Sequence, residues 1–274
     1  LPLMNTIKHI IAVASGKGGV GKSTTAVNLA LALQSLGARV GLLDADIYGP
    51  SQQKMLGIAD DVKPEQQGGQ YLLPVMAHGL KTMSMGYLSN DKTPMVWRGP
   101  MAGGALVQML EQTLWGELDY LVIDMPPGTG DIQLTLSQKA TVAGAVIVTT
   151  PQDIALLDAQ KGIEMFRKVD VPILGIIENM AVHICSECGH AEHIFGAEGG
   201  QRIATDYGVS LLASLPLAMS IREQTDSGNP TVVAEPDSPV AALYRQAAEQ
   251  VQATLGEAAR GGVQPFPEIT ISDD

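Results

Sequence analysis

Residues 16–23 read Gly-Lys-Gly-Gly-Val-Gly-Lys-Ser, which matches the spacing of a phosphate-binding loop, G-x-x-x-x-G-K-[ST]. The glycines let successive backbone N–H groups turn toward an anion, because glycine adopts positive φ without a steric penalty. Lys22 is placed to reach the terminal phosphates of a nucleotide, and the Ser23 hydroxyl is placed to bind Mg²⁺. An apolar run leads into the loop, and a helical pattern over 23–36 follows it. The phosphates are therefore expected at a helix N-terminus. The predicted nucleotide contacts in this loop are Gly16, Lys17, Gly18, Gly19, Val20, Gly21, Lys22, Ser23 and Thr24.

A second lysine, Lys17, lies inside the loop directly after its first glycine. It is either an incidental surface lysine or a cation meant for phosphate. Lys17 and Lys22 can hardly serve one nucleotide symmetrically, so the useful alternative is that Lys17 reaches the nucleotide of a partner subunit, as an arginine finger does in trans. The motif K-G-G-V-G-K-S resembles the deviant phosphate-binding loop of the MinD/ParA/nitrogenase-iron-protein superfamily of dimerising ATPases. That resemblance implies a nucleotide-dependent homodimer.

Acidic side chains follow two other candidate strands. Asp44 and Asp46 lie at i and i+2 on an extended segment, a spacing that predicts side chains pointing the same way at one edge of a sheet. Asp124 ends an apolar run and precedes Met-Pro-Pro-Gly-Thr-Gly-Asp, an arrangement typical of a Walker B carboxylate at the metal. A solvated acidic turn and a plain strand-to-turn junction are the alternatives. Asn179 ends a later apolar run, and its amide can donate to and accept from an adenine edge.

Both cysteines of the chain, Cys185 and Cys188, form a C-x₂-C in the polar segment 183–190. Two thiolates at this spacing can bind one soft metal from one side, but they supply half of a four-sulfur set. Three interpretations stay open: a zinc site completed by a nearby histidine, a cluster shared between two chains across a two-fold axis, and an incidental pair. The nearby histidines are His183, His190 and His193, and each is expected to face solvent.

Composition limits the partners of the chain. Its 274 residues are 45% hydrophobic, enough to bury the core of one large α/β domain. The net charge of −12 argues against non-specific nucleic-acid binding and against docking on anionic lipid. The sequence shows neither a membrane-length apolar run nor a secretory signal, and two cysteines cannot form a disulfide framework, so the reducing cytoplasm is the expected compartment. Because the chain begins at Leu1 rather than Met, we expect that an upstream piece has been removed.

Short apolar runs alternate with helical patterns along the chain. This alternation predicts an α/β fold, a doubly wound, mostly parallel sheet with helices on both faces and ligands at the carboxyl ends of the strands. The expected strands are 10–14, 40–43, 120–124, 145–149, 173–177 and 210–215, and the expected helices include 102–114 and 155–168. Residues 70–76 and 80–85 are expected to form a hairpin or an irregular insertion. We expect a single P-loop domain over 1–261 and an extended or mobile tail over 262–274.

The segments 44–51 and 124–131, followed by the Cys185/Cys188 pair, closely resemble the Mrp/ApbC (Nbp-type) iron–sulfur cluster carrier ATPases. The resemblance implies ATP and Mg²⁺ as cofactors and a labile [4Fe–4S] cluster bridged between two subunits by the two cysteines. It further implies slow ATP hydrolysis tied to transfer of the cluster to apo-proteins.

The same resemblance implies roles for individual residues. Asp46 matches the residue that orients the attacking water and contacts Mg²⁺ through water, and Asp44 matches a neighbouring switch residue. Asn179 and Pro216 match positions beside the adenine. Lys17, Lys22 and Asp46 are thus the expected catalytic residues, and the loops around Asp46 and Asp131 are expected to sense the γ-phosphate.

The alternative function is a MinD/ParA-like dimerising switch ATPase with a structural zinc at the cysteine pair. A positional ATPase of this kind would carry a basic amphipathic C-terminal helix or a basic surface. Here an apolar stripe from Val240 to Leu255 lies in a segment that carries Arg245 and Arg260 against two glutamates. This pattern predicts a helix that packs on its own sheet rather than on a membrane.

Overall fold

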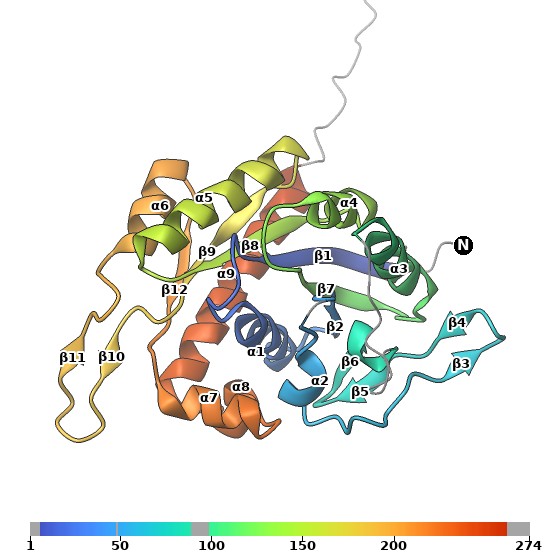
Figure 1. Cartoon of the computed structure of the whole chain (residues 1–274), viewed down its shortest axis with the longest axis horizontal. Helices are drawn as coiled ribbons and strands as arrows, with labels where there is room; N and C mark the ends of the chain where they lie inside the picture. The colour runs from blue at the N-terminus through green and yellow to red at the C-terminus, as the bar shows by residue number, and fades with distance from the viewer. Residues whose placement is uncertain (1–5, 48, 89–98, 262–274) are drawn as a thin grey trace, which may run out of the picture.

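The computed structural model describes residues 6–47, 49–88 and 99–261 (Figure 1). The expected tail, 262–274, lies outside these residues. Eight strands form one sheet in the order β12-β9-β8-β1-β7-β2-β6-β5. All neighbouring pairs in this sheet are parallel except β5 and β6. The strands are β1 (Ile7–Ala14), β2 (Val40–Asp44), β5 (Val75–Ala77), β6 (Leu80–Ser84), β7 (Leu118–Asp124), β8 (Gly144–Thr149), β9 (Ile173–Glu178) and β12 (Leu211–Ser214).

Helices cover both faces of the sheet (Figure 1). Ile10, Ala12 and Ala14 of β1 pack into one core, whereas the alternating residues Ile11 and Val13 pack into the other. The first core contains α3 (Gly99–Gln112), α4 (Asp131–Lys139), α5 (Asp153–Lys168) and α6 (Gly199–Tyr207). The second contains α1 (Lys22–Ser35), α8 (Thr231–Ala234) and α9 (Pro239–Gly261). The predicted doubly wound fold is confirmed.

The C-terminal helix α9 lies against the molecule's own core. Tyr244, Ala247, Val251 and Leu255 are buried, as the apolar stripe predicts. In the described ranges, none of the helices combines the length and the apolar character that crossing a membrane requires.

The expected hairpin is present, with a shorter first arm. β5 pairs antiparallel with β6, while β4 (Tyr71–Leu72) pairs with β3 (Gln66–Gln67) instead. β6 also pairs in parallel with β2, so the hairpin extends the main sheet to its edge. The described residues also include two short helices, α2 (Gln52–Met55) and α7 (Met219–Asp226), and a 3₁₀ turn over Met85–Tyr87.

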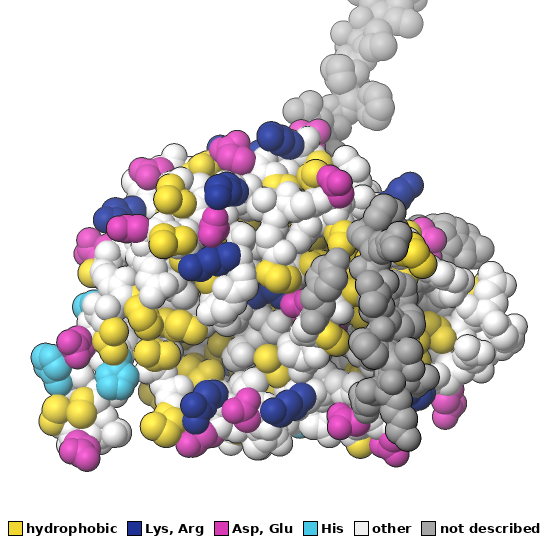
Figure 2. Space-filling model, viewed as in Figure 1, with side chains coloured by type: hydrophobic (Ala, Val, Ile, Leu, Met, Phe, Trp, Pro, Cys, Tyr) yellow, Lys and Arg dark blue, Asp and Glu magenta, His cyan; other side chains and the backbone are white. Residues whose placement is uncertain are grey.

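A second hairpin was not expected from the sequence. β10 (His183–Ile184) and β11 (Ala191–Glu192) pair antiparallel and project from the sheet (Figure 1). Histidine side chains gather on the surface of this hairpin (Figure 2). Its arms are two residues long, too short to show an alternation from which a strand could be predicted. The cysteines lie in the turn that joins the two arms.

Candidate functional site

The loop between β1 and α1 has the backbone shape of an anion cradle. Gly19 and Gly21 adopt φ of 81° and 82°. Gly21 caps α1 without a side-chain hydrogen bond, so the first N–H groups of the helix meet no side-chain acceptor there. A Cβ on Gly16 would overlap the carbonyl group of Asp158 on α5, which explains glycine at that position. The loop lines a 170 Å³ pocket together with Asp46 and Pro127, and a helix N-terminus of this shape suits phosphate.

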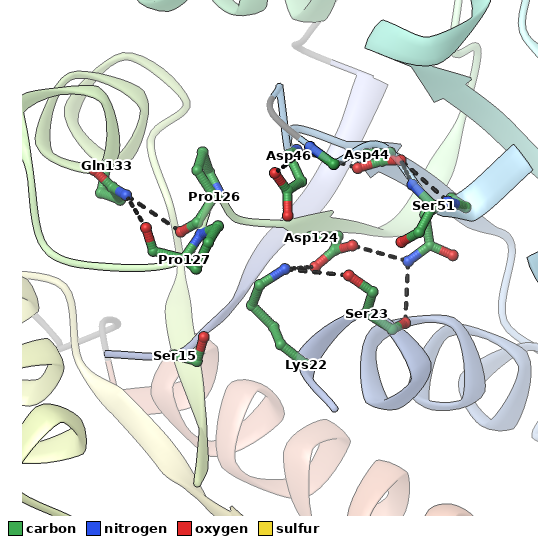
Figure 3. Close-up of polar contacts among 12 residues, drawn as sticks. Ser15, Lys22, Ser23, Asp44, Asp46, Ser51, Asp124, Pro126, Pro127 and Gln133 are labelled. Atoms are coloured by element: carbon green, nitrogen blue, oxygen red, sulfur yellow. Dashed lines mark hydrogen bonds and ion pairs between the residues drawn. The ribbon is translucent and has the colours of Figure 1, made fainter. Parts of the chain in front are cut away.

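Lys22 and Asp124 form a buried ion pair in the floor of this pocket (Figure 3). Lys22 is 6% exposed and Asp124, at the end of β7, is fully buried. The Lys22 Nζ also lies 3.3 Å from the Ser23 hydroxyl. The two residues are 102 positions apart and meet because β1 and β7 are neighbours in the sheet.

Gln52, at the start of α2, belongs to the same group and was not predicted. Its Nε2 donates to Asp124 Oδ2 and to the Ser23 carbonyl, both at 3.0 Å. Its Oε1 is buried and has no hydrogen-bond partner among the described residues. A spare buried acceptor beside a carboxylate and a hydroxyl offers oxygen ligands of the kind that Mg²⁺ prefers. In the sequence, the feature that could have drawn attention to Gln52 is its position directly after the segment 44–51.

Asp44 and Asp46 point in different directions, contrary to the expectation from their spacing (Figure 3). Asp46 lines the phosphate pocket and is half-buried. Asp44 is fully buried and accepts N–H groups of Asp46, Ser51 and Gln52 at 3.1 Å. The strand ends at Asp44, so the alternation that predicted a common direction stops there. Asp44 therefore shapes the loop that carries Asp46.

Burial raises the pKa of the Asp44 carboxyl, and the negative charge of Asp124 raises it further. The N–H groups that it accepts act in the opposite direction, because they stabilise the charged form. The Ser84 hydroxyl also donates to this carboxylate, at 3.1 Å. Four donors on one buried carboxylate indicate an organising role for Asp44.

The segment after Asp124 is tied to the phosphate loop. The Gly128 N–H donates to the Ser15 carbonyl at 3.0 Å. Gln133 of α4 donates to the carbonyls of Pro126 and Pro127 at 3.3 and 2.8 Å (Figure 3). Asp131, whose surrounding loop is expected to sense the γ-phosphate, is the exposed first residue of α4 and lines a neighbouring 590 Å³ pocket. Of that loop, Pro127 lines the phosphate pocket.

A second pocket, of 220 Å³, adjoins the phosphate pocket and shares Gly21, Thr24 and Met55 with it. Both residues expected beside adenine, Asn179 and Pro216, line it. The Asn179 Nδ2 donates to the Val20 carbonyl at 3.0 Å, so this side chain reaches back to the phosphate loop. The size and position suit a nucleoside whose phosphates lie on that loop.

The two cysteines lie in a tight turn between β10 and β11. The Cys185 N–H donates to the His190 carbonyl and the Cys185 carbonyl accepts from Gly189, both at 2.9 Å. Hydrogen bonds from the backbone N–H groups of Cys188 and Glu187 lower the pKa of the Cys185 thiol. Cys188 is exposed. Cys185 is partly exposed. The turn therefore brings both sulfurs toward the surface and favours the thiolate form of Cys185, which is the form that binds a metal.

The histidines near this turn do not complete a metal site. In the described ranges there is no group of three or more His, Cys, Asp or Glu side chains that could hold a metal ion. His190 is exposed, and His193 Nδ1 is engaged with the Ala181 carbonyl at 2.9 Å. Of the two metal-site hypotheses, a zinc completed by His183, His190 or His193 has no support in the described part of the chain.

The chain is similar to proteins named for carrying or transferring iron–sulfur clusters. The chain matches a family model described as ParA, NUBPL iron-transfer P-loop NTPase, over residues 6–252. It is 66% identical over 248 residues to an iron-sulfur cluster carrier protein from Pseudomonas fragi, which covers 90% of this chain and 86% of that protein. It is 51% identical over 247 residues to the iron-sulfur cluster transfer protein NUBPL of Mus musculus, at 89% and 77% coverage.

Among solved structures, a nucleotide-binding protein from Archaeoglobus fulgidus in complex with ADP has a TM-score of 0.75 at 36% identity. The match covers 87% of this chain and 92% of that chain.

Proposed function

The chain belongs to the ParA/NUBPL family of iron-transfer P-loop NTPases, and on that premise we propose that it is an ATP-hydrolysing iron–sulfur cluster carrier. The observation that carries the proposal is the projecting turn with Cys185 and Cys188, which supplies two sulfur ligands on the same chain as an ATPase-type phosphate loop. Two thiolates are half of the set that a four-iron cluster needs. Two copies of the chain complete it.

In this proposal, each residue of the nucleotide site has a separate role. The N–H groups of residues 16–24 bind the phosphates, and Lys22 neutralises their charge. Lys22 pairs with Asp124 in the structure. When the nucleotide binds, phosphate would replace Asp124 as the partner of Lys22, and the metal would replace Lys22 as the partner of Asp124. Ser23 and Asp124, with the spare oxygen of Gln52, would hold Mg²⁺, whose charge offsets that of the phosphates. Asp46, held at the pocket by the Asp44 network, positions the attacking water.

Dimerisation is part of the same proposal. Lys17 is half-buried at the rim of the phosphate pocket, where it can reach the nucleotide of a second copy. Large apolar side chains are exposed on the cysteine hairpin and near the start of α5, and a second copy would cover them. The exposed side chains are Ile154, Leu157, Ile184 and Ile194. The loops around Asp46 and Asp131 would transmit the state of the γ-phosphate to this interface.

We further propose that the carrier acts in the cytoplasm, where thiols stay reduced, and delivers its cluster to apo iron–sulfur proteins. Binding of nucleic acid or of a membrane forms no part of this function, given the net charge of −12. The tail 262–274 is left outside the single ATPase domain in this proposal.

The test is the iron and acid-labile sulfide content after anaerobic reconstitution, measured on a sample of known oligomeric state. We expect about two irons and two sulfides per chain in a dimer, which is one four-iron cluster on four thiolates. Zinc at about one per two chains, with no iron, would overturn the carrier in favour of a MinD/ParA-like switch with a structural zinc.

The matched control is the double variant Cys185→Ser/Cys188→Ser. It should lose the cluster and keep ATP binding, since no cysteine lines either nucleotide pocket. Mixing the reconstituted wild-type chain with an apo-protein that requires a [4Fe–4S] cluster, with and without ATP, then measures transfer. Full cluster binding by the double variant would contradict the assignment of the two ligands.

A further inference from the structure

The nucleoside pocket and the cysteine hairpin share a wall. Asn179, Met180, Pro216 and Leu217 line the pocket beside the phosphate loop. Asn179 and Met180 immediately precede the segment that becomes β10. The side chains that a nucleoside would touch are therefore joined directly to the base of the cysteine hairpin.

Hydrogen bonds fasten this base to the opposite wall of the pocket. The Ala181 N–H donates to the Leu215 carbonyl at 2.9 Å, and the Leu217 N–H donates to the Val182 carbonyl at 2.8 Å. His183 and Leu217 continue the pairing as a parallel bridge. The two lining segments 179–180 and 216–218 are thus joined by hydrogen bonds at the start of the hairpin.

The returning arm of the hairpin is fastened to the same base by one side chain. His193 Nδ1 lies 2.9 Å from the Ala181 carbonyl oxygen, to which the ring can only donate. His193 follows β11 directly, so its hydrogen bond joins the second arm to the first. The turn with Cys185 and Cys188 lies between these two fastened arms.

Non-glycine residues with left-handed backbone conformations lie at both ends of this unit. Met180 has φ of 56° and Glu198 has φ of 58°, and neither is glycine. Outside them the chain is anchored, because the buried Glu178 carboxylate accepts the N–H of Gly200 at the start of α6. Strained non-glycine residues at both ends of one segment are typical of elements that change arrangement.

The phosphate pocket connects to this unit through Asn179, whose Nδ2 donates to the Val20 carbonyl of the phosphate loop at 3.0 Å. Apart from Gly21, Thr24 and Met55, which belong to both pockets, its lining consists of Ser15, residues of the phosphate loop, residues of the loop after β2, and Pro127. None of its described lining residues lies in the segment 178–217.

We propose that the Cys185/Cys188 hairpin responds to the nucleoside part of the nucleotide, through Asn179 and Met180, with His193 as the positioning residue that fastens the hairpin to the pocket. This inference rests on the proposed function, since it names a regulation of that site. Binding in the pocket selects one arrangement of the wall, and the wall is continuous with both arms of the hairpin. The γ-phosphate is not required for this response.

The experiment measures how fast iodoacetamide alkylates the two cysteines in the reduced, cluster-free full chain, by mass spectrometry. Mg·ADP fills the nucleoside pocket and the phosphate loop, whereas Mg·pyrophosphate fills the loop alone. We expect saturating ADP to change the alkylation rate by about fivefold, and pyrophosphate, at a concentration that displaces ADP, to leave it unchanged. An equal effect of pyrophosphate, or no effect of ADP, would overturn the proposal.

Three variants test whether His193 connects the cysteine hairpin to the nucleoside pocket. In His193→Ala the response to ADP should disappear while the affinity for ADP stays within about twofold of wild type, because His193 does not line the pocket. His193→Asn keeps a donor near the position of Nδ1 and should restore the response. His190→Ala, which removes an exposed histidine of the same hairpin, should keep it. A full response in His193→Ala would overturn the role of His193.

The measurement separates this inference from the proposed function. The chain contains no cluster during alkylation, so the response to ADP does not depend on iron or sulfide content. A chain that binds zinc instead of a cluster can still show the response, and a reconstituted carrier can lack it.

Discussion

The Lys22–Asp124 pair joins binding of nucleotide to the stability of the sheet. Both groups are nearly inaccessible to water, and each is the principal counter-charge of the other. A buried charge without its partner is costly, because the interior cannot solvate it. Lys17, in the same loop, is half-buried and forms no ion pair among the described residues.

Lys22→Ala should abolish nucleotide binding and lower the free energy of unfolding by about 3 kcal/mol, because it leaves the Asp124 carboxylate buried without its cation. Lys17→Ala is the matched control. It should keep ADP binding and change stability by less than about 0.5 kcal/mol, while hydrolysis falls roughly a thousandfold if Lys17 acts in trans. Calorimetric titration with ADP, urea unfolding and phosphate release measure the three quantities. Normal ADP binding by Lys22→Ala would show that the phosphates do not lie on this loop.

At the scale of elements, the phosphate loop has its shape because it passes close to α5. Gly16 lies against the main chain at Asp158, with no room for a Cβ. Gly18, two residues later, has open space around the position where a Cβ would be. The loop therefore requires glycine at Gly16 because of packing, and this requirement does not extend to Gly18.

Gly16→Ala should lower the free energy of unfolding by about 2 kcal/mol, since either the loop or α5 must shift to admit the methyl group. Gly18→Ala adds the same methyl group and should change stability by less than about 0.5 kcal/mol. Urea unfolding of both variants, followed by circular dichroism, tests the difference. Equal stability of the two variants would show that the approach of the loop to α5 is not tight in solution.

At the scale of the whole molecule, an ion-pair group links three segments at the amino ends of the central strands. Asp119 of β7 accepts from Lys8 Nζ of β1 at 2.8 Å. It also accepts from the backbone N–H of Arg39, before β2, at 2.8 Å and from its guanidinium at 3.1 Å. The side-chain hydrogen bonds from Arg39 and then Lys8 hold the pKa of the Asp119 carboxyl well below its usual range. Because the Asp119 side chain is 21% exposed, these ion pairs contribute only modestly to the free energy of unfolding.

Asp119→Asn should lower the free energy of unfolding at pH 7 by about 1 kcal/mol. Because the pKa of Asp119 is lower in the folded chain than in the unfolded one, its contribution is present above about pH 4 and is lost as the pH falls below that value. The stability difference between wild type and variant should therefore shrink toward zero in acid. Glu164→Gln, which removes a solvent-exposed partner 3.9 Å from Arg167, should have almost no effect at either pH. A difference that stays constant from pH 7 to pH 3 would contradict the ionic origin of the effect.

The chemistry of single segments could be read from the sequence because it depends on neighbours in the chain. The phosphate loop, the carboxylate that ends β7 and the cysteine pair are each defined by spacing within about ten residues. The alternation of apolar runs and helical patterns likewise predicted the doubly wound sheet, because strands covered on both faces must be apolar throughout.

Only the tertiary structure decided which distant residues meet. The pairing of Lys22 with Asp124, the spare oxygen of Gln52 and the turning of Asp44 away from Asp46 all depend on strand order and on where a strand ends. The same holds for the wall shared by the nucleoside pocket and the cysteine hairpin. Its two sides come from segments about β9 and β12, which become neighbours in the folded sheet. Local spacing predicts the chemistry that each segment can perform, whereas long-range packing determines which segments act together.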